Sequence, residues 1–518
     1  MLRAGRAGGL RDLLAISGLV LLTALVFEDH VRRGFFVADD WFYNAVARFG
    51  GHAMGLSHGR TVAALFDVFP DRPTLPFVFG AMHKAFGLHM KLYVATAVGA
   101  GLVMAVLLYV LLRMLRIERV HSFAIAALAL LFPFADAPRL WTTGLQASLA
   151  VILFLAGLIV AVLGLRTSGR RAIALHIAAI ALYLLSILTY QLTFGLVLAS
   201  GLVYLAEVPR RAALYRWGTD VGTIVVGGSI AISRTAKSHG IHLHRLEHVY
   251  RTAFDLLPAA ATGKVSSIGW TALALVLLGI PALAALAAWR LPDIELRRWT
   301  MVAGVGIVMA AAGYVALVPA KSYNALDVGI GNRVNLAASL GMVTLVYADM
   351  VLISLVVMRG PLRPLRLVPV VIVAVVLGIG YHSTLAEHER NYHQAYNIER
   401  IVIGSMTALR AQPPPSGTML YVVGHPFYVN GVPVFSRTSE TRAAAKIFVN
   451  PSFQAAPLAG LAKLVCRRFD VYPPAWGLGA RAAYGRAIVV ESFSHRATRL
   501  TSRSVCLHGK FPLTAVAG

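Results

Sequence analysis

The sequence is poor in charged residues. Only 14% of its 518 residues are Asp, Glu, Lys or Arg, whereas 58% are hydrophobic, and its mean hydropathy is positive. Soluble globular domains carry about 25% charged residues. The composition therefore excludes that class and predicts a protein that crosses a membrane several times.

Acidic residues are the scarcer of the two charge types. The chain has 23 Asp and Glu against 48 Lys and Arg, which gives a net charge of +25. A nucleic-acid groove would show a basic stripe with interleaved aromatic residues. Here the basic residues form short clusters between long apolar runs, as cytoplasmic anchors of membrane proteins do. We therefore expect membrane lipids, and no nucleic acid, as partners.

Cysteine is nearly absent. The chain has only Cys466 and Cys506, both near the C-terminus, and this pair is compatible with one disulfide in an oxidising compartment. We find no internal repeat and no low-complexity region. No small-residue cleavage site follows the first apolar run, so we expect an uncleaved first helix.

Long apolar runs dominate what is present. A membrane span needs about 20 apolar residues. The stretch from 172 to 206 is too long for one span, and a polar reversal near Tyr190 divides it into two. The predicted spans are 12–28, 92–112, 121–135, 146–165, 172–188, 192–207, 217–233, 268–289, 300–318, 335–358 and 367–382.

Arginine clusters indicate the orientation of these spans, because cytoplasmic loops are enriched in Lys and Arg. Clusters occur at the N-terminus and in every second loop, at 3–11, 113–119, 166–171, 210–216, 290–298 and 359–366. The sequence therefore predicts an all-α polytopic membrane protein of about 11 transmembrane helices with a cytoplasmic N-terminus. This bundle would occupy residues 1–382, with long external loops at 29–91, 234–267 and 319–334.

The C-terminal residues 383–518 differ in character from the bundle. Residues 386–411 have helical spacing, and "PPPSG" ends that pattern. "TMLYVVG" and "RAIVVES" are short strand-like runs. We expect a small extracytoplasmic α/β domain here.

The stretch "FFVADDWFYNAVARFGG", which begins at Phe35, places two adjacent carboxylates directly after the first apolar run. Repulsion between Asp39 and Asp40 would raise the proton affinity of one of them, which suits a general base near neutral pH. The alternative is a solvated helix start, with Trp41 as an anchor at the membrane interface.

The order of the first external loop, an apolar span, an acidic pair, "GR" and then "RPTLP", resembles that of polytopic GT-C glycosyltransferases. The resemblance implies a multi-span bundle, a polyprenyl-phosphate sugar donor, catalysis on the outer face and a first-loop carboxylate as base. Matched onto this chain, it makes Asp39 and Asp40 the catalytic candidates. It adds Asp136, in "PFADAPRLW", as a second acidic residue.

A phosphate leaving group needs cations to stabilise its developing charge. The residues expected to contact substrate are Trp41, Arg60, Arg72, Arg139, Lys321 and Arg333. For each arginine the alternative is a turn or a lipid-headgroup contact. The histidine-rich stretch at 239–248 lacks the "HEXXH" order, so we expect no metal and no other cofactor.

Together the composition and the resemblance imply a glycosyltransferase of the bacterial inner membrane. It would transfer a hexosyl or pentosyl group from a polyprenyl-phosphate donor to a cell-envelope glycan, lipid or protein. The tail would then be periplasmic or extracellular. A transporter or flippase for a lipid-linked or anionic solute is the alternative, although such proteins show inverted repeats and charged groups at the membrane midplane. An envelope scaffold is a third possibility.

Overall fold

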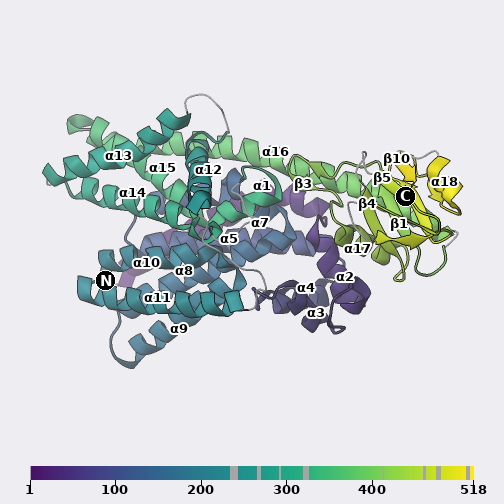
Figure 1. The fold of residues 1–518 in the computed structure, drawn as a ribbon. Helices are drawn as coiled ribbons and strands as arrows, with labels where there is room; N and C mark the ends of the chain where they lie inside the picture. Colours follow the sequence, from purple (N-terminus) through teal and green to yellow (C-terminus); the bar gives the residue numbers. More distant parts are fainter. Residues whose placement is uncertain are drawn as a thin grey trace. The chain divides into compact units, whose positions relative to one another are not determined.

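The structure is a computed structural model. It describes residues 2–233, 243–264, 270–290, 293–318, 326–411, 414–458, 463–473, 480–508 and 514–517. The chain is mostly helical, with a small region of strands near the C-terminus (Figure 1).

Eight helices in the described part of the chain are long and apolar enough to cross a membrane. The fold is therefore that of a multi-pass membrane protein. These helices are α1 (Leu2–Arg33), α5 (Met90–Met114), α8 (Leu145–Leu165), α9 (Gly169–Thr189), α13 (Trp270–Arg290), α14 (Ile294–Ala312), α15 (Leu336–Val357) and α16 (Leu367–Thr407).

The other three predicted spans are also helical but do not meet the same criterion. Two of them, α6 (Arg119–Leu131) and α10 (Phe194–Glu207), have only 13 and 14 residues. The third, α11 (Arg210–Ser233), is long enough but carries several charged residues. The predicted reversal near Tyr190 is confirmed, because α9 ends at Thr189 and a 3₁₀ turn precedes α10.

The remaining helices are shorter or more polar. They are α2 (Asp39–Phe49), α3 (Thr61–Val68), α4 (Leu75–Phe86), α7 (Ala137–Leu140), α12 (Leu243–Thr262), α17 (Thr438–Phe448) and α18 (Arg503–His508). Short 3₁₀ helices connect several of them, and one of these, η6 (Gly329–Asn335), contributes to the site described below.

Helix α15 is the most enclosed of the membrane helices, because 78% of its apolar segment is buried within the protein. Two glycines allow its backbone to approach that of α14. A Cβ atom built at Gly341 would lie 2.2 Å from the backbone nitrogen of Ala310, and one at Gly306 would lie 2.9 Å from that of Leu345. Such close approach is how membrane helices gain van der Waals packing without a hydrophobic driving force.

The chain divides into two compact units. The helical unit contains Met1–Arg33, Asp71–Thr74 and Val94–His388. The mixed unit contains Gly34–Pro70, Leu75–Tyr93 and Glu389–Gly518. Most of the first external loop thus falls in the same unit as the tail.

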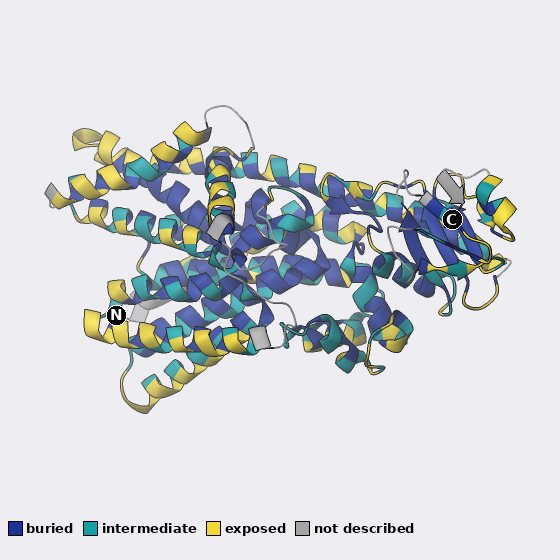
Figure 2. Cartoon of the chain, in the orientation of Figure 1, coloured by how far each residue is buried: buried dark blue, intermediate teal, exposed yellow. Residues whose placement is uncertain are grey.

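A parallel sheet forms the core of the tail. Strand β1 (Met419–Val423) pairs in parallel with β4 (Gln454–Leu458) on one side and with β8 (Ala487–Glu491) on the other. Strand β9 (Ala497–Arg499) extends the sheet beside β8, and α17 packs against β4. The three parallel strands are largely buried (Figure 2). The two strand-like runs in the sequence are therefore confirmed as strands, and the structure shows that they pair with one another.

Smaller strands complete the tail. A second sheet has the order β10-β5-β6-β7, and a two-stranded hairpin joins β2 to β3. Their bounds are β2 (Tyr428–Val429), β3 (Val432–Pro433), β5 (Lys463–Cys466), β6 (Asp470–Tyr472), β7 (Ala482–Ala483) and β10 (Thr514–Ala517).

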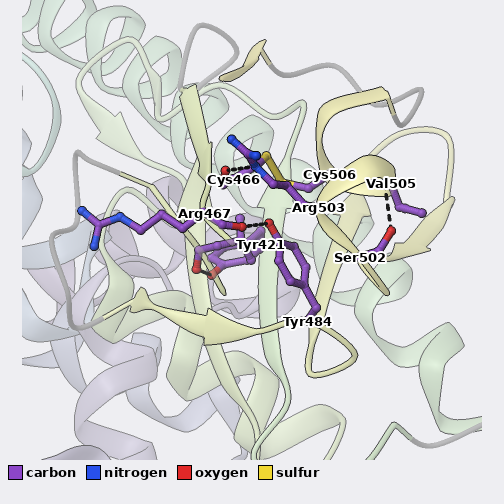
Figure 3. Close-up of a disulfide and its surroundings, with 9 residues drawn as sticks. Tyr421, Cys466, Arg467, Tyr484, Ser502, Arg503, Val505 and Cys506 are labelled. Carbon is purple, nitrogen blue, oxygen red and sulfur yellow. Dashed lines mark hydrogen bonds between the residues drawn. A yellow bond between two sulfur atoms is a disulfide. The ribbon is translucent and has the colours of Figure 1, made fainter. Parts of the chain in front are cut away.

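The predicted disulfide between Cys466 and Cys506 is present and links β5 to α18 across a sequence separation of 40 residues. Figure 3 shows Arg503 beside the disulfide, where its Nε donates a 3.1 Å hydrogen bond to the carbonyl oxygen of Cys466. Both cysteines are fully buried. A buried structural disulfide fits an extracytoplasmic location for this part of the chain.

Candidate functional site

The acidic pair lies at the first turn of α2, directly after a strained residue. Ala38 precedes the helix with φ 54° and ψ −124°, a conformation that residues with a Cβ rarely adopt. Such a residue costs about 1–3 kcal/mol and persists only where surrounding contacts impose it. The chain therefore enters α2 in a fixed direction, which fixes the positions of Asp39 and Asp40.

Asp40 is engaged within the protein. Its side chain is buried, and its Oδ2 accepts a 3.1 Å hydrogen bond from the backbone N–H of Val37. Its own carbonyl oxygen accepts a bond from the side-chain amide of Asn44 at 2.9 Å. These contacts match the helix-start role that the sequence left open for the pair.

Asp39 is the accessible member of the pair. Its side chain is 23% exposed, and its Oδ1 lies 3.4 Å from Nη1 of Arg437, which is itself 62% exposed. Arg437 immediately precedes α17, so the tail supplies a cation to the carboxylate of the first loop. A positive charge at this distance favours the ionised carboxylate, the form that can accept a proton.

Trp41 is completely buried in the mixed unit. Its indole N–H donates a 2.8 Å hydrogen bond to Glu399, and its rings pack edge-on against Phe36 and Phe448. We expected a substrate contact or an interface anchor here. Because Trp41 is fully buried, it has no surface for a substrate or a lipid. In the structure it packs α2 against α16 and α17.

Two further carboxyl groups lie in the same unit. Glu399 is fully buried and Glu440 is 1% exposed. Glu440 caps α17 by accepting a 3.1 Å hydrogen bond from the backbone N–H of Arg437. Burial, and then the charge of Asp39, raise the pKa of Glu440 to about 8, although Arg437 opposes the shift. At neutral pH this carboxyl therefore holds a proton.

A separate polar centre forms in the helical unit around Asp136. Two prolines, at 133 and 138, interrupt helix formation there, so the chain makes a short buried turn. The Asp136 carboxylate is fully buried. Its Oδ1 accepts a 2.7 Å bond from Nδ2 of Asn332, and its Oδ2 lies 2.6 Å from Nδ1 of His388. Both oxygens of the carboxylate are therefore occupied.

Two asparagines of η6 hold this turn in place. The Oδ1 of Asn332 accepts a 2.9 Å bond from the backbone N–H of Ala137, while Nδ2 of Asn335 donates to the carbonyl oxygen of Phe134 at 2.7 Å. From this segment the sequence singled out only Arg333. The asparagines were missed, although polar side chains in an apolar region were the available signal.

Arg72 and Arg333 lie against aromatic rings of the helical unit. Arg72 donates a 2.8 Å bond to Gln146 and lies over the ring of Tyr190, 4.5 Å from its centroid. Arg333 lies over the ring of Trp141 at 5.2 Å. Arg72 also lies 3.4 Å from the carboxylate of Asp71, and Nη1 of Arg333 donates to the carbonyl oxygen of Ile330 at 2.5 Å, so both guanidinium groups are engaged within the helical unit.

Arg139 is fully buried. Its Nη2 donates to the carbonyl oxygen of Phe132 at 2.5 Å, while its Nε and Nη1 have no hydrogen-bond partner among the described residues. Its stem lies against α5 at Gly101, where an added Cβ would come within 2.9 Å of the arginine. Burial of a guanidinium with unsatisfied donors costs free energy, and an anion beside it would reduce that cost. This turn is therefore suited to a negatively charged group.

The predicted site residues therefore divide between the two units. Those in the mixed unit are Asp39, Asp40, Trp41 and Arg60. Those in the helical unit are Arg72, Asp136, Arg139 and Arg333.

Arg60 is exposed and directly precedes α3, away from the contacts described above. Lys321, another expected cation, lies outside the described residues. Among the residues that the structure describes, no three His, Cys, Asp or Glu side chains are grouped so as to hold a metal ion.

Comparison with known proteins gives no further assignment. No protein-family model matches the sequence, and no curated protein is significantly similar to it. The arrangement of side chains in each unit is therefore the basis for a functional proposal.

Proposed function

We propose that this protein is a GT-C-type glycosyltransferase of the bacterial inner membrane, which transfers a sugar from a polyprenyl-phosphate donor to a cell-envelope acceptor. The proposal rests on the sequence resemblance of the first loop. The observation that supports it most is that the two members of the acidic pair differ in exposure. Asp40 is buried at the start of α2, whereas Asp39 is accessible beside Arg437.

In this proposal Asp39 is the general base. It would remove a proton from the acceptor hydroxyl as that oxygen attacks the anomeric carbon of the donor. The bond from that carbon to the phosphate oxygen breaks at the same time, and the lipid phosphate leaves without needing a general acid. Arg437, which lies 3.4 Å from Asp39, would keep this carboxylate ionised before the reaction.

We also propose eleven spans, a cytoplasmic N-terminus and an extracytoplasmic tail. Helix α11 is the least apolar of the predicted spans, but its Arg216 and Asp220 form a buried ion pair at 2.7 Å. Tyr204 of α10 donates a 2.7 Å hydrogen bond to the same aspartate. Pairing of this kind reduces the penalty for placing charged residues in a membrane. The disulfide supports an oxidising environment for the tail.

The test is a transfer assay in membrane vesicles of both orientations. They would carry the wild type, Asp39→Asn or Asp40→Asn, with radiolabelled polyprenyl-phosphate sugars as donors. We expect Asp39→Asn to slow the loss of label from the lipid by about 10²–10⁴-fold, the usual contribution of a general base. Asp40→Asn should chiefly lower the amount of folded protein.

Asp67→Asn is a matched control. Asp67 lies in the same loop, is 20% exposed and pairs with His58 at 2.7 Å, so it resembles Asp39 in exposure and pairing. Normal transfer by Asp39→Asn would refute its role as base. Label that crosses the bilayer yet stays on the lipid, in every variant, would instead indicate a flippase.

A further inference from the structure

The pairing of Asp136 with His388 suggests a role for a histidine that the sequence did not single out. These residues are 252 positions apart, and their side chains meet at 2.6 Å in the helical unit. A carboxylate that accepts from Nδ1 fixes the tautomer and the orientation of an imidazole ring. The ring of His388 is therefore held in one orientation, with Nε2 as its remaining functional atom.

Asp136 itself is poorly placed to take a proton from a substrate. It is fully buried, and Asn332 and His388 occupy its two oxygens. His388 retains 8% of its surface, and its Nε2 makes no hydrogen bond within the described part of the chain. Of the two partners, the histidine is the one that can reach a ligand.

The charges around His388 determine what kind of ligand suits it. Burial disfavours a charged ring, whereas Asp136, Glu387 and Asp327 all favour the imidazolium form. An imidazolium donates from both nitrogens, so with Nδ1 directed at Asp136 its Nε2–H would seek an acceptor. The buried guanidinium of Arg139, from the same turn as Asp136, adds positive charge to this centre.

We propose that His388 binds an anionic phosphate oxygen of the lipid-linked donor through Nε2, and that Asp136 is its positioning residue. This assignment rests on the proposed function, because it takes the donor to be a polyprenyl phosphate. It changes the role expected of Asp136 from catalysis to orientation of a cation. A charge-assisted hydrogen bond to phosphate is the interaction that the site would provide.

The test measures binding and needs no sugar transfer. Full-length protein in nanodiscs would be titrated with a polyprenyl phosphate that carries no sugar, and with the neutral polyprenol of the same length. Hydrogen bonds to charged groups contribute about 1.5–3 kcal/mol, so His388→Gln should bind the phosphate about 10–100-fold more weakly. Binding of the polyprenol should be unchanged.

Two comparisons make this result specific. His382→Gln changes an exposed histidine of the same helix and should bind like the wild type. In the wild type, phosphate binding should weaken as rising pH removes the imidazolium charge, and this dependence should be lost in His388→Gln. If that variant does not fold, Asp136→Asn keeps the ring but removes its charged partner, and it should likewise weaken phosphate binding.

The outcomes separate the two proposals. If the wild type prefers the phosphate and a folded His388→Gln binds it equally well, the proposed role of His388 is wrong. The proposed glycosyltransferase function would not be affected by that result. A wild type that binds phosphate and polyprenol alike would remove the donor class on which both proposals depend.

Discussion

Two carboxylates, Asp136 of the helical unit and Asp39 of the mixed unit, lie in opposite surroundings. In the helical unit Asp136 is completely enclosed, with a hydrogen-bond donor on each oxygen. In the mixed unit Asp39 keeps 23% of its side chain exposed and faces an arginine that is itself largely in solvent. The enclosed carboxylate can orient a partner side chain. The exposed one can meet a solute but contributes little to the fold.

The units also differ in how their folds are maintained. The helical unit relies on apolar helices that pack closely enough for backbone contact between α14 and α15. The mixed unit has a small sheet and a disulfide. Small cores often need such covalent support, because they bury too little apolar surface.

Removal of the disulfide should have the largest effect on stability, and only in the mixed unit. Closing a loop with a sequence separation of 40 residues is worth about 4 kcal/mol in the chain-entropy account. Cys466→Ser combined with Cys506→Ser should therefore accelerate hydrogen exchange in β5 and α18. Exchange in α15 should not change. Equal protection of the tail with and without the bond would contradict this expectation.

Removal of the enclosed carboxylate should have the next largest effect. Asp136→Ala leaves His388 and Asn332 without their shared acceptor, which should lower the free energy of unfolding by about 2–4 kcal/mol. Asp39→Ala should change it by less than about 0.5 kcal/mol, because the ion pair there is exposed. Thermal melting of both variants in the same detergent would compare their stabilities. Equal losses of stability would mean that the two carboxylates do not differ in their contribution to the fold.

The pH dependence of stability should report on Glu440. Its folded-state pKa is raised to about 8 from an ordinary 4.5, so the folded protein holds a proton that the unfolded chain releases. Its contribution to stability is complete below about pH 4.5 and is lost as the pH rises to about 8. Glu440→Gln should remove this decline between pH 6.5 and 8.

A buried histidine of the tail explains the choice of this pH range. Burial lowers the pKa of His425 to about 4 from 6.5. Its contribution is present above about pH 6.5 and is lost as the pH falls towards 4, which opposes the effect of Glu440 at lower pH. If the melting temperatures of the wild type and of Glu440→Gln change in parallel from pH 6.5 to 8, Glu440 is not the group responsible for the decline.

Removal of the exposed cation should have the smallest effect. Arg437→Ala breaks a 3.4 Å ion pair whose arginine is 62% exposed, so the change in stability should be under about 1 kcal/mol. If the pair helps to keep Asp39 ionised, transfer should fall by about fivefold at most. Arg437→Lys should retain most of the activity, whereas a large loss in the lysine variant would indicate a direct contact with substrate.

Much of the fold was predictable because its signals are local. Eight of the predicted spans coincide with long apolar helices, and the strands around Leu420 and Val489 were found from their composition. The disulfide was predictable because the chain offers a single pair of cysteines. Helix α11 was harder to evaluate, because the compensation of Arg216 by Asp220 depends on side-chain packing.

The candidate sites were predictable only in part. The sequence identified Asp39 and Asp136 but gave them similar roles, since burial cannot be read from residue type. Their decisive partners lie far away in the chain: His388 is 252 residues from Asp136, and Glu399 is 358 residues from Trp41. No periodicity relates residues at such separations, so these pairs emerge only when the chain folds.

The disulfide has a practical consequence for determining which loops lie on each side of the membrane. Because it consumes the chain's two cysteines, a cysteine introduced elsewhere would be the sole free thiol. Ser168→Cys lies in a loop predicted to be cytoplasmic, and Ser416→Cys lies in the tail; both positions are exposed. A thiol reagent that cannot cross the bilayer, added to intact cells, should then label Ser416→Cys and spare Ser168→Cys, and the two native cysteines need not be replaced.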